Sequence, residues 1–202
     1  MRQVTKFYLT SFLKNQTYFT PILILFLQAA TLNYLEIFWV FTIGSITSLI
    51  IEIPTGIIAD LFGKRRSIII SKFGIFISFF VYGLSSTFWM FVLAQVLYQL
   101  GNSFRSGTET AYTYDFLLQN KNNPSYTEVK GKQKFYARIG EAIATSLGSV
   151  IAVGFGYNWV FFIAAIPAFL NFILYPIIQY VILVIFAWNN SCLNEIRIFF
   201  VA

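Results

Sequence analysis

The chain contains, between two long apolar runs, the stretch Glu52-Ile-Pro-Thr-Gly-Ile-Ile-Ala-Asp-Leu-Phe-Gly-Lys-Arg-Arg66. Gly56 and Asp60 are four residues apart, so they share one face of a helix, and the glycine would let a neighbouring helix approach closely. Asp60 falls at a helix end where the dipole disfavours a carboxylate, so it should pair with a cation or a facing helix N-terminus. Gly63 suits a tight turn before three basic residues. The stretch therefore predicts two helices joined by a short basic turn.

The composition explains why these helices should lie in a membrane. The chain has 202 residues, of which 57% are hydrophobic and 11% are charged. A soluble domain carries about a quarter charged residues, so a disordered chain, a coiled coil and an ordinary cytosolic globule are excluded. Histidine is absent and Cys192 is the single cysteine, which excludes histidine catalysis, an internal disulfide, and metal sites of histidine or paired cysteines. No cofactor and no metal are expected.

Six apolar stretches approach the roughly 20 residues that a helix needs to cross a bilayer. They are Tyr18–Leu35, Ile37–Ala59, Ser67–Ser86, Phe88–Phe116, Phe135–Phe155 and Trp159–Phe186. In lipid the backbone must satisfy its own hydrogen bonds, so each stretch is expected to be a helix. The sequence thus predicts an all-α, polytopic membrane bundle of two three-helix sets. It divides into a cytoplasmic N-terminal segment (1–17), a six-helix domain (18–186) and a short cytoplasmic tail (187–202).

The basic residues give the orientation of this bundle. Lysine and arginine gather before the first span and after the second, fourth and sixth. The three opposite connections, near Glu36, Ser85–Thr87 and Gly156–Asn158, hold neither residue. The positive-inside rule therefore places both termini in the cytoplasm, in a multi-pass protein of the cell membrane. This bias accounts for the net charge of +6. A nucleic-acid partner is not expected, because the basic residues are confined to membrane-flanking loops.

The turn between the second and third spans resembles the signature loop of the major facilitator superfamily, G-x-x-x-D-x-x-G-[RK]-[RK]. In that family the loop is a latch, whose aspartate and basic residues pair with charges at neighbouring helix ends and hold the outward-open state. The resemblance implies a secondary transporter that moves a small solute by alternating access. The latch residues that it marks are Gly56, Asp60, Gly63, Lys64, Arg65 and Arg66, with Asp115 from the fourth span. The alternative is a plain basic loop, which does not explain the two glycines and the aspartate together.

The fourth span carries polar residues along one helical face. They recur at steps of three and four and are Gln95, Gln99, Asn102, Ser106, Glu109 and Thr113. Arg105 lies beside this stripe and four residues before Glu109, so the two side chains are placed to pair along the helix. The segment Ser103–Asp115 also resembles the fourth helix of a superfamily subgroup in which an arginine is often linked to proton coupling. The alternative is a structural Arg105–Glu109 pair that fixes helix packing.

The fifth span begins with Arg138 and Glu141 and continues with small residues at every fourth position. These are Gly140, Ala144, Gly148, Ala152 and Gly156, and they predict close helix packing. Glu141 is expected either to take up protons or to pair with Arg138. Glu52 is expected either to face a cavity or to bond to another helix. The candidate path for solute or protons therefore comprises Glu52, Asn102, Arg105, Glu109 and Glu141.

The superfamily fold has twelve helices in two halves with the substrate cavity between them. The resemblance covers the first half, from about Phe7 to Ile173, so a second six-helix half or a homodimer partner is expected beside the lipid bilayer. Two alternatives remain. One is a truncated, non-transporting fragment or membrane assembly module. The other is a membrane-embedded enzyme with a Ser–Lys or aspartyl mechanism, which is disfavoured because Lys72 has no serine partner by spacing and no paired intramembrane aspartates are seen.

Overall fold

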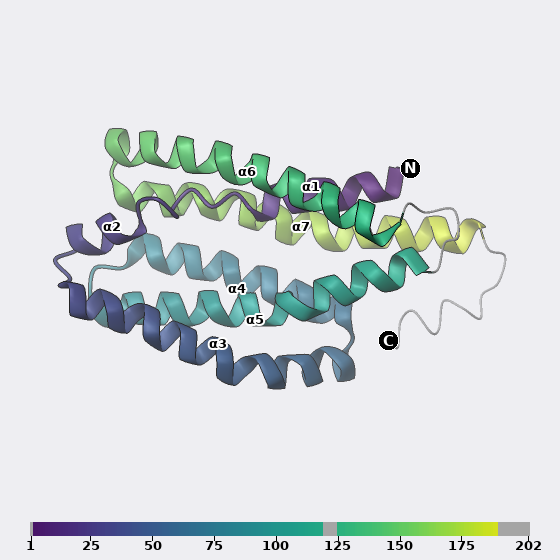
Figure 1. Ribbon diagram of the computed structural model, residues 1–202, viewed down its shortest axis with the longest axis horizontal. Coiled ribbons are helices and arrows are strands. Elements are labelled where there is room, and N and C mark those ends of the chain that lie inside the picture. Colours follow the sequence, from purple (N-terminus) through teal and green to yellow (C-terminus); the bar gives the residue numbers. More distant parts are fainter. Residues whose placement is uncertain (1, 119–124, 190–202) are drawn as a thin grey trace.

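A computed structural model of the chain describes residues 2–118 and 125–189 (Figure 1). Some side chains within these helices lie outside the description, namely those of residues 2–7, 59, 60, 62, 64, 65, 106, 107, 109–112, 115, 116, 118 and 175–189. The elements of the described ranges are all helices, which confirms the predicted all-α class. They are α1 (Arg2–Lys14), α2 (Leu23–Ala29), α3 (Tyr34–Phe62), α4 (Lys64–Leu84), α5 (Phe88–Leu118), α6 (Tyr126–Phe155) and α7 (Tyr157–Asn189).

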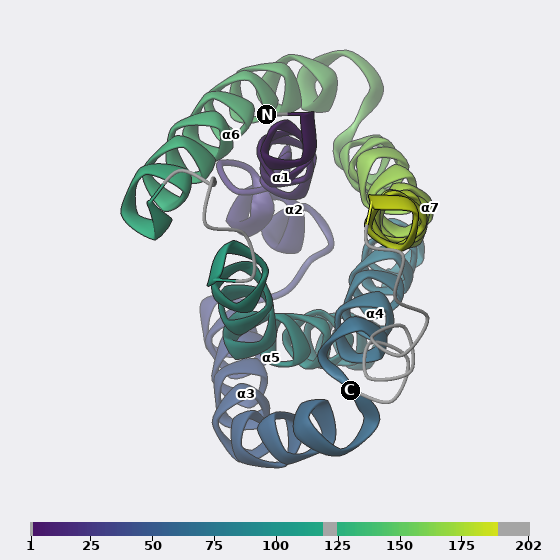
Figure 2. The same ribbon diagram turned by 90° about the vertical axis from the view of Figure 1, so that its right-hand side faces the viewer.

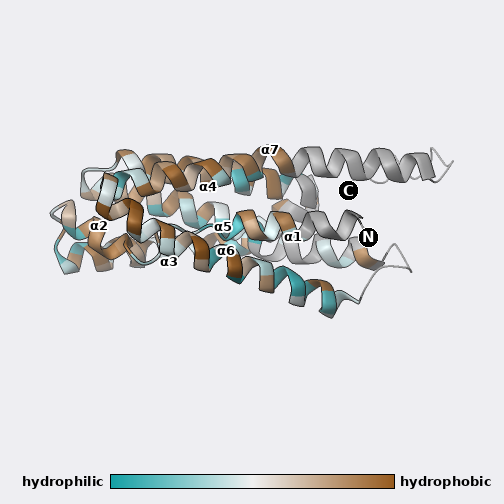
Figure 3. Cartoon of the chain, turned by 90° about the horizontal axis from the view of Figure 1, so that it is seen from above, coloured by the Kyte–Doolittle hydropathy of each residue, from teal (hydrophilic) through white to brown (hydrophobic). Residues whose placement is uncertain are grey.

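Four helices of the described residues are long and apolar enough to cross a membrane. They contain Tyr34–Ile58, Arg66–Leu84, Tyr126–Phe155 and Tyr157–Leu174, and they correspond to the predicted second, third, fifth and sixth spans. Helix α5 covers the predicted fourth span over 31 residues, but polar residues recur along it. Figure 3 shows that α4 and α7 are predominantly hydrophobic along their described length, whereas the start of α6 is hydrophilic.

The predicted first span, Tyr18–Leu35, is not one continuous helix. Helix α1 ends at Lys14, residues 15–22 run through turns and irregular backbone, and α2 covers only Leu23–Ala29. Two residues account for the break. The Asn15 side chain donates to the carbonyl of Ser11 at 3.0 Å at the end of α1, and Pro21 disfavours helical backbone at the residue before it. The expectation of a single helix there is therefore wrong.

The helices pack in two groups that differ from the order of the chain. Helix α5 packs on α3 and α4, whereas α1 packs on α6 and α7, and the contact between α4 and α7 joins the two groups. The view along the bundle shows α1 beside α6 (Figure 2). Helix α1 thus packs with the predicted fifth and sixth spans rather than with the second and third, whereas α2 contacts α3.

The core lies where α2, α4, α5 and α7 meet. Phe161 is fully buried there, with ring centroids 4.8 Å from Phe26 and 5.0 Å from Tyr82. Small residues bring α4 and α5 together, because the Ser71 hydroxyl donates to the carbonyl of Gly101 at 2.6 Å. Outward-facing apolar side chains, such as Val153 at 91% exposure, cover much of the surface. Such a surface is typical of a protein whose outer solvent is lipid.

The basic segments of the chain gather at one end of the bundle. The N-terminus, the turn between α3 and α4, the end of α5 and the start of α6 all lie at the right-hand end of Figure 1. The connections that lack lysine and arginine, between α4 and α5 and between α6 and α7, lie at the opposite end. The structure therefore agrees with the charge asymmetry on which the predicted orientation rests.

Candidate functional site

The turn between α3 and α4 has the tight geometry that the sequence predicts. Gly63 is buried and adopts φ 90° and ψ 136°, a backbone conformation that favours glycine. Gly56 is exposed, and a Cβ built on it would meet no atom within 4 Å. Arg66 is exposed. The side chains of Asp60, Lys64, Arg65 and Asp115 lie outside the described residues, so the latch role stays a prediction.

The small-residue stripe of α6 packs against the broken first span. Gly140, Ala144, Gly148 and Ala152 are buried. A Cβ on Gly140 would lie 2.7 Å from the carbonyl oxygen of Phe12 in α1. This confirms the predicted packing role for these four residues. Gly156 differs, because it is exposed and ends α6 with a φ of 94°.

A cavity of about 670 Å³ opens between α1, α5 and α6. Three residues of the predicted path line it, Asn102 and Arg105 from α5 and Glu141 from α6. The break after α1 contributes Asn15 to its wall. A smaller cavity of about 100 Å³ adjoins it, since both are lined by Lys14, Asn15, Tyr98 and Arg105. The sequence pattern thus places three of its five path residues around one polar space.

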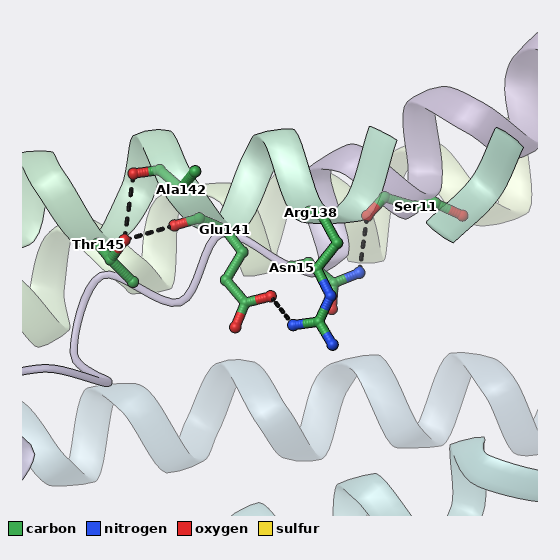
Figure 4. A network of polar contacts seen from close by, with 6 residues as sticks. All are labelled: Ser11, Asn15, Arg138, Glu141, Ala142 and Thr145. Atoms are coloured by element: carbon green, nitrogen blue, oxygen red, sulfur yellow. Dashed lines mark hydrogen bonds and ion pairs between the residues drawn. The ribbon is translucent and has the colours of Figure 1, made fainter. Parts of the chain in front are cut away.

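Two polar pairs set the geometry of the larger cavity. The Arg105 guanidinium donates to Asn102 Oδ1 at 2.7 Å, one helical turn away on α5. On α6, Arg138 Nη1 lies 2.6 Å from Glu141 Oε2, which confirms the expected pairing of Glu141 with Arg138. Figure 4 shows this ion pair together with Asn15 of the broken first span. The side chain of Glu109 lies outside the description, so its pairing with Arg105 stays a prediction.

Comparison with known protein families identifies this architecture. Residues 8–181 match the Major Facilitator Superfamily. The chain belongs to this superfamily. No curated protein matches it. Superfamily members are transporters rather than enzymes, and together with the apolar helices the match shows a multi-pass membrane protein of transporter type.

Lys72 is a buried cation of this superfamily member that the predicted path does not include. Its side chain is only 4% exposed within α4, and its ammonium donates to Asn171 Oδ1 of α7 at 3.0 Å. Asn171 in turn donates to the carbonyl of Thr10 in α1 at 3.5 Å. Lys72 and Asn171 both line the smaller cavity. The available signal was a lysine five residues after the start of the predicted span Ser67–Ser86, because an ionisable residue at membrane depth normally faces the bundle interior.

Two other polar residues lie apart from the cavities of this superfamily member. Glu52 is exposed on α3 and is not among the described residues that line either cavity. Gln95, the first residue of the polar stripe, is buried and accepts a hydrogen bond from the Tyr82 hydroxyl at 2.5 Å. A Cβ on Gly44 would lie 2.6 Å from Gln95 Cγ. The start of the stripe therefore packs α5 against α3 and α4, and the stripe faces the cavity only further along the helix.

Proposed function

We propose that this chain is a unit of a secondary transporter that moves a small solute across the cell membrane by alternating access. The observation that carries the proposal is the cavity of about 670 Å³ between α1, α5 and α6. Its volume falls in the range of about 300 to 1,000 Å³ typical of small-molecule sites. Its wall combines helix faces with a stretch of non-helical backbone, an arrangement found at the substrate sites of secondary transporters.

The proposal assigns six spans to the chain, in two three-span repeats. The first span begins earlier in this proposal than the predicted Tyr18. It consists of α1, which falls in the segment 1–17 that the sequence predicts to be cytoplasmic, the irregular residues 15–22 and α2. The other five spans are α3 to α7. Non-helical backbone is tolerated at membrane depth where it is buried in protein or lines a cavity, and Asn15 and Thr17 line the smaller cavity. The basic end of the bundle faces the cytoplasm, together with both termini.

A second six-helix unit completes the transporter in this proposal. The superfamily cavity lies between two halves, and here the cavity has walls from three helices of one half. Helix α3 supports the idea independently, because it leaves Ile53 74% exposed and Gly56 without any neighbouring atom. A second half would shield such surfaces together with the lipid. The latch residues between α3 and α4 would then pair with charges at its helix ends.

Proton coupling is the finer part of the proposal. Glu109 and Glu141 are the candidate proton carriers. Glu141 is bound to Arg138, so its protonation would release the arginine and loosen a contact in the cavity wall. A movement of this kind is what a coupling residue must produce when the cavity changes sides.

Flux into proteoliposomes tests the proposal. The purified chain would be reconstituted and assayed for uptake of labelled succinate, phosphate, alanine, glucose and choline, with and without an inward proton gradient. We expect saturable uptake of at least one probe, and Glu109→Gln or Glu141→Gln should abolish its response to the gradient. Glu128→Gln is the matched control, because Glu128 is exposed and pairs with Lys132 outside the cavity wall. Uptake that never exceeds that of empty liposomes would favour an assembly module instead.

A further inference from the structure

The charged side chains that line the larger cavity are mainly cations. Its described wall carries Lys14, Arg105, Lys130, Lys134 and Arg138, against the single described carboxylate of Glu141. That carboxylate is bound to Arg138 at 2.6 Å. Even if Glu109 also faced this space, the cations would outnumber the carboxylates. The cavity therefore has a positive potential, which attracts anions.

Two of the cations beside the cavities, Lys72 and Arg105, lie inside the bundle, so the positive-inside rule does not explain them. Lys72 lies eight residues after the start of α4, which is about 12 Å along the helix axis. Arg105 lies 13 residues before the end of α5, which is about 20 Å. Lysines and arginines that set orientation lie in the flanking loops. Cations held inside the bundle are costly and usually mark a binding site or a transport path.

The broken first span brings further polar groups to the same place. Asn15 lines both cavities, and Thr17 lines the smaller one. The Thr17 hydroxyl is buried and has no hydrogen-bond partner among the described residues. Buried hydroxyls are normally paired, so a bound solute or its water would supply the missing partner. Lys14, the last residue of α1, lines both cavities next to this break.

We infer that the solute is an anion whose carboxylate or phosphate group binds between Arg105 and Lys14. This inference rests on the proposed transport function and names the class of its substrate. A guanidinium has five N–H donors in a planar fork, so Arg105 can hold Asn102 and a solute oxyanion together. Lys14 adds a positive charge from α1. Lys72 is buried and lines the smaller cavity together with Arg105, so it raises the potential further.

The closing experiment measures binding to the purified full chain in detergent, separately from flux. Thermal unfolding would be followed against increasing succinate, inorganic phosphate, glucose and choline, at one ionic strength set with sodium chloride. We expect a saturable rise of the unfolding temperature with succinate, with phosphate or with both. These two arms distinguish a carboxylate from a phosphate solute. Glucose and choline should give no saturable rise.

A matched pair of variants controls for net charge. Lys134→Gln removes a cation from the cavity wall, whereas Lys132→Gln removes one two residues away on the same helix, outside the described wall. The anion affinity should fall about threefold in the first and stay unchanged in the second. Arg105→Gln should lower it at least tenfold, and Arg105→Lys should restore part of the loss. Lys14→Gln gives the same test if the Arg105 variants do not fold.

The outcomes separate the inference from the transport function. Anion binding without any flux would support the anion site and contradict the transporter. Flux of glucose, alanine or choline without competition by either anion would support the transporter and overturn the anion site. Binding of neither anion, or equal binding by the wild type and Arg105→Gln, would also overturn it.

Discussion

The carbonyl oxygen of Tyr18 lies against Gly148, so close that a Cβ built on this glycine would overlap it. Tyr18 belongs to the irregular stretch that interrupts the first span, and Gly148 lies in the middle of α6. Only a residue without a side chain lets the irregular backbone approach the helix this closely. The small-residue stripe of α6 is therefore what holds the broken span in place beside the cavity.

The first prediction concerns this contact. Gly148→Ala should destabilise the chain by about 1 to 3 kcal/mol, because the new methyl group overlaps the Tyr18 carbonyl. Thermal unfolding in detergent is the measurement. Gly154→Ala is the control in the same helix, since a Cβ there would meet no atom within 4 Å. The control should be neutral or slightly stabilising, because alanine favours a helix over glycine. Equal behaviour of the two variants would show that the close approach does not exist.

The second prediction concerns the turn between α3 and α4. Gly63 has φ 90° and ψ 136°, where an L side chain is strained, so Gly63→Ala should cost about 1 to 3 kcal/mol. Gly131→Ala is the control, because Gly131 is exposed in α6 with open space around it. Unfolding temperatures of both variants would be compared with the wild type. A Gly63→Ala variant as stable as the wild type would rule out this turn geometry.

The third prediction concerns the buried lysine. Lys72→Met and Asn171→Leu should be non-additive, with a coupling free energy of about 1 kcal/mol or more, because each removes the same hydrogen bond. Reversible unfolding in mixed micelles would give the four free energies of the double-mutant cycle. The pair Ser48 and Phe80 lies in different parts of the bundle, and Ser48→Ala with Phe80→Leu should be additive. A coupling near zero for Lys72 and Asn171 would show that their contact adds no stability.

The fourth prediction concerns the second half. In a Cys192→Ser background, a cysteine replacing Ala137, which lines the larger cavity, should crosslink in membranes to a second six-helix unit. Ile70→Cys is the control, because Ile70 is exposed on α4 and does not line the cavity. The mass of the crosslinked product is the readout. Crosslinking at Ile70 but not at Ala137 would place the interface on the other side of the bundle.

The sequence predicted the helices best where hydropathy and glycine spacing within one segment determine the structure. Hydropathy located α3, α4, α6 and α7, because an apolar run of sufficient length has few alternatives to a helix in lipid. The glycine spacing predicted both the turn at Gly63 and the packing face around Gly148. The first span was predicted wrongly, because its hydropathy is continuous across the break. Hydropathy does not register the capping by Asn15 or the restriction that Pro21 places on the backbone.

The candidate site was predicted in part for a different reason. A polar stripe on one helix predicts that its residues share a face, and Asn102 and Arg105 do line the cavity. The stripe does not predict which helix this face packs against. Gln95, for example, packs against Tyr82 of α4. Lys72 was considered from the sequence only as a candidate partner of a catalytic serine. Its partner Asn171 is 99 residues away in the chain, and Thr10, which accepts from Asn171, is 161 residues from Asn171, so no local pattern reveals these contacts.

The pairing of α1 with α6 and α7 has a consequence for biosynthesis. Among the described helices α1 leaves the ribosome first, whereas α6 and α7, which it packs against, follow all the others. Until then the Lys14 end of α1 and its irregular continuation have no glycine-lined helix to rest on. Long-range contacts of this kind form slowly and leave intermediates exposed. Of the described helices, α3, α4 and α5 are therefore expected to assemble before α6 and α7 pack on α1, and the cavity wall is complete only once α6 is in place.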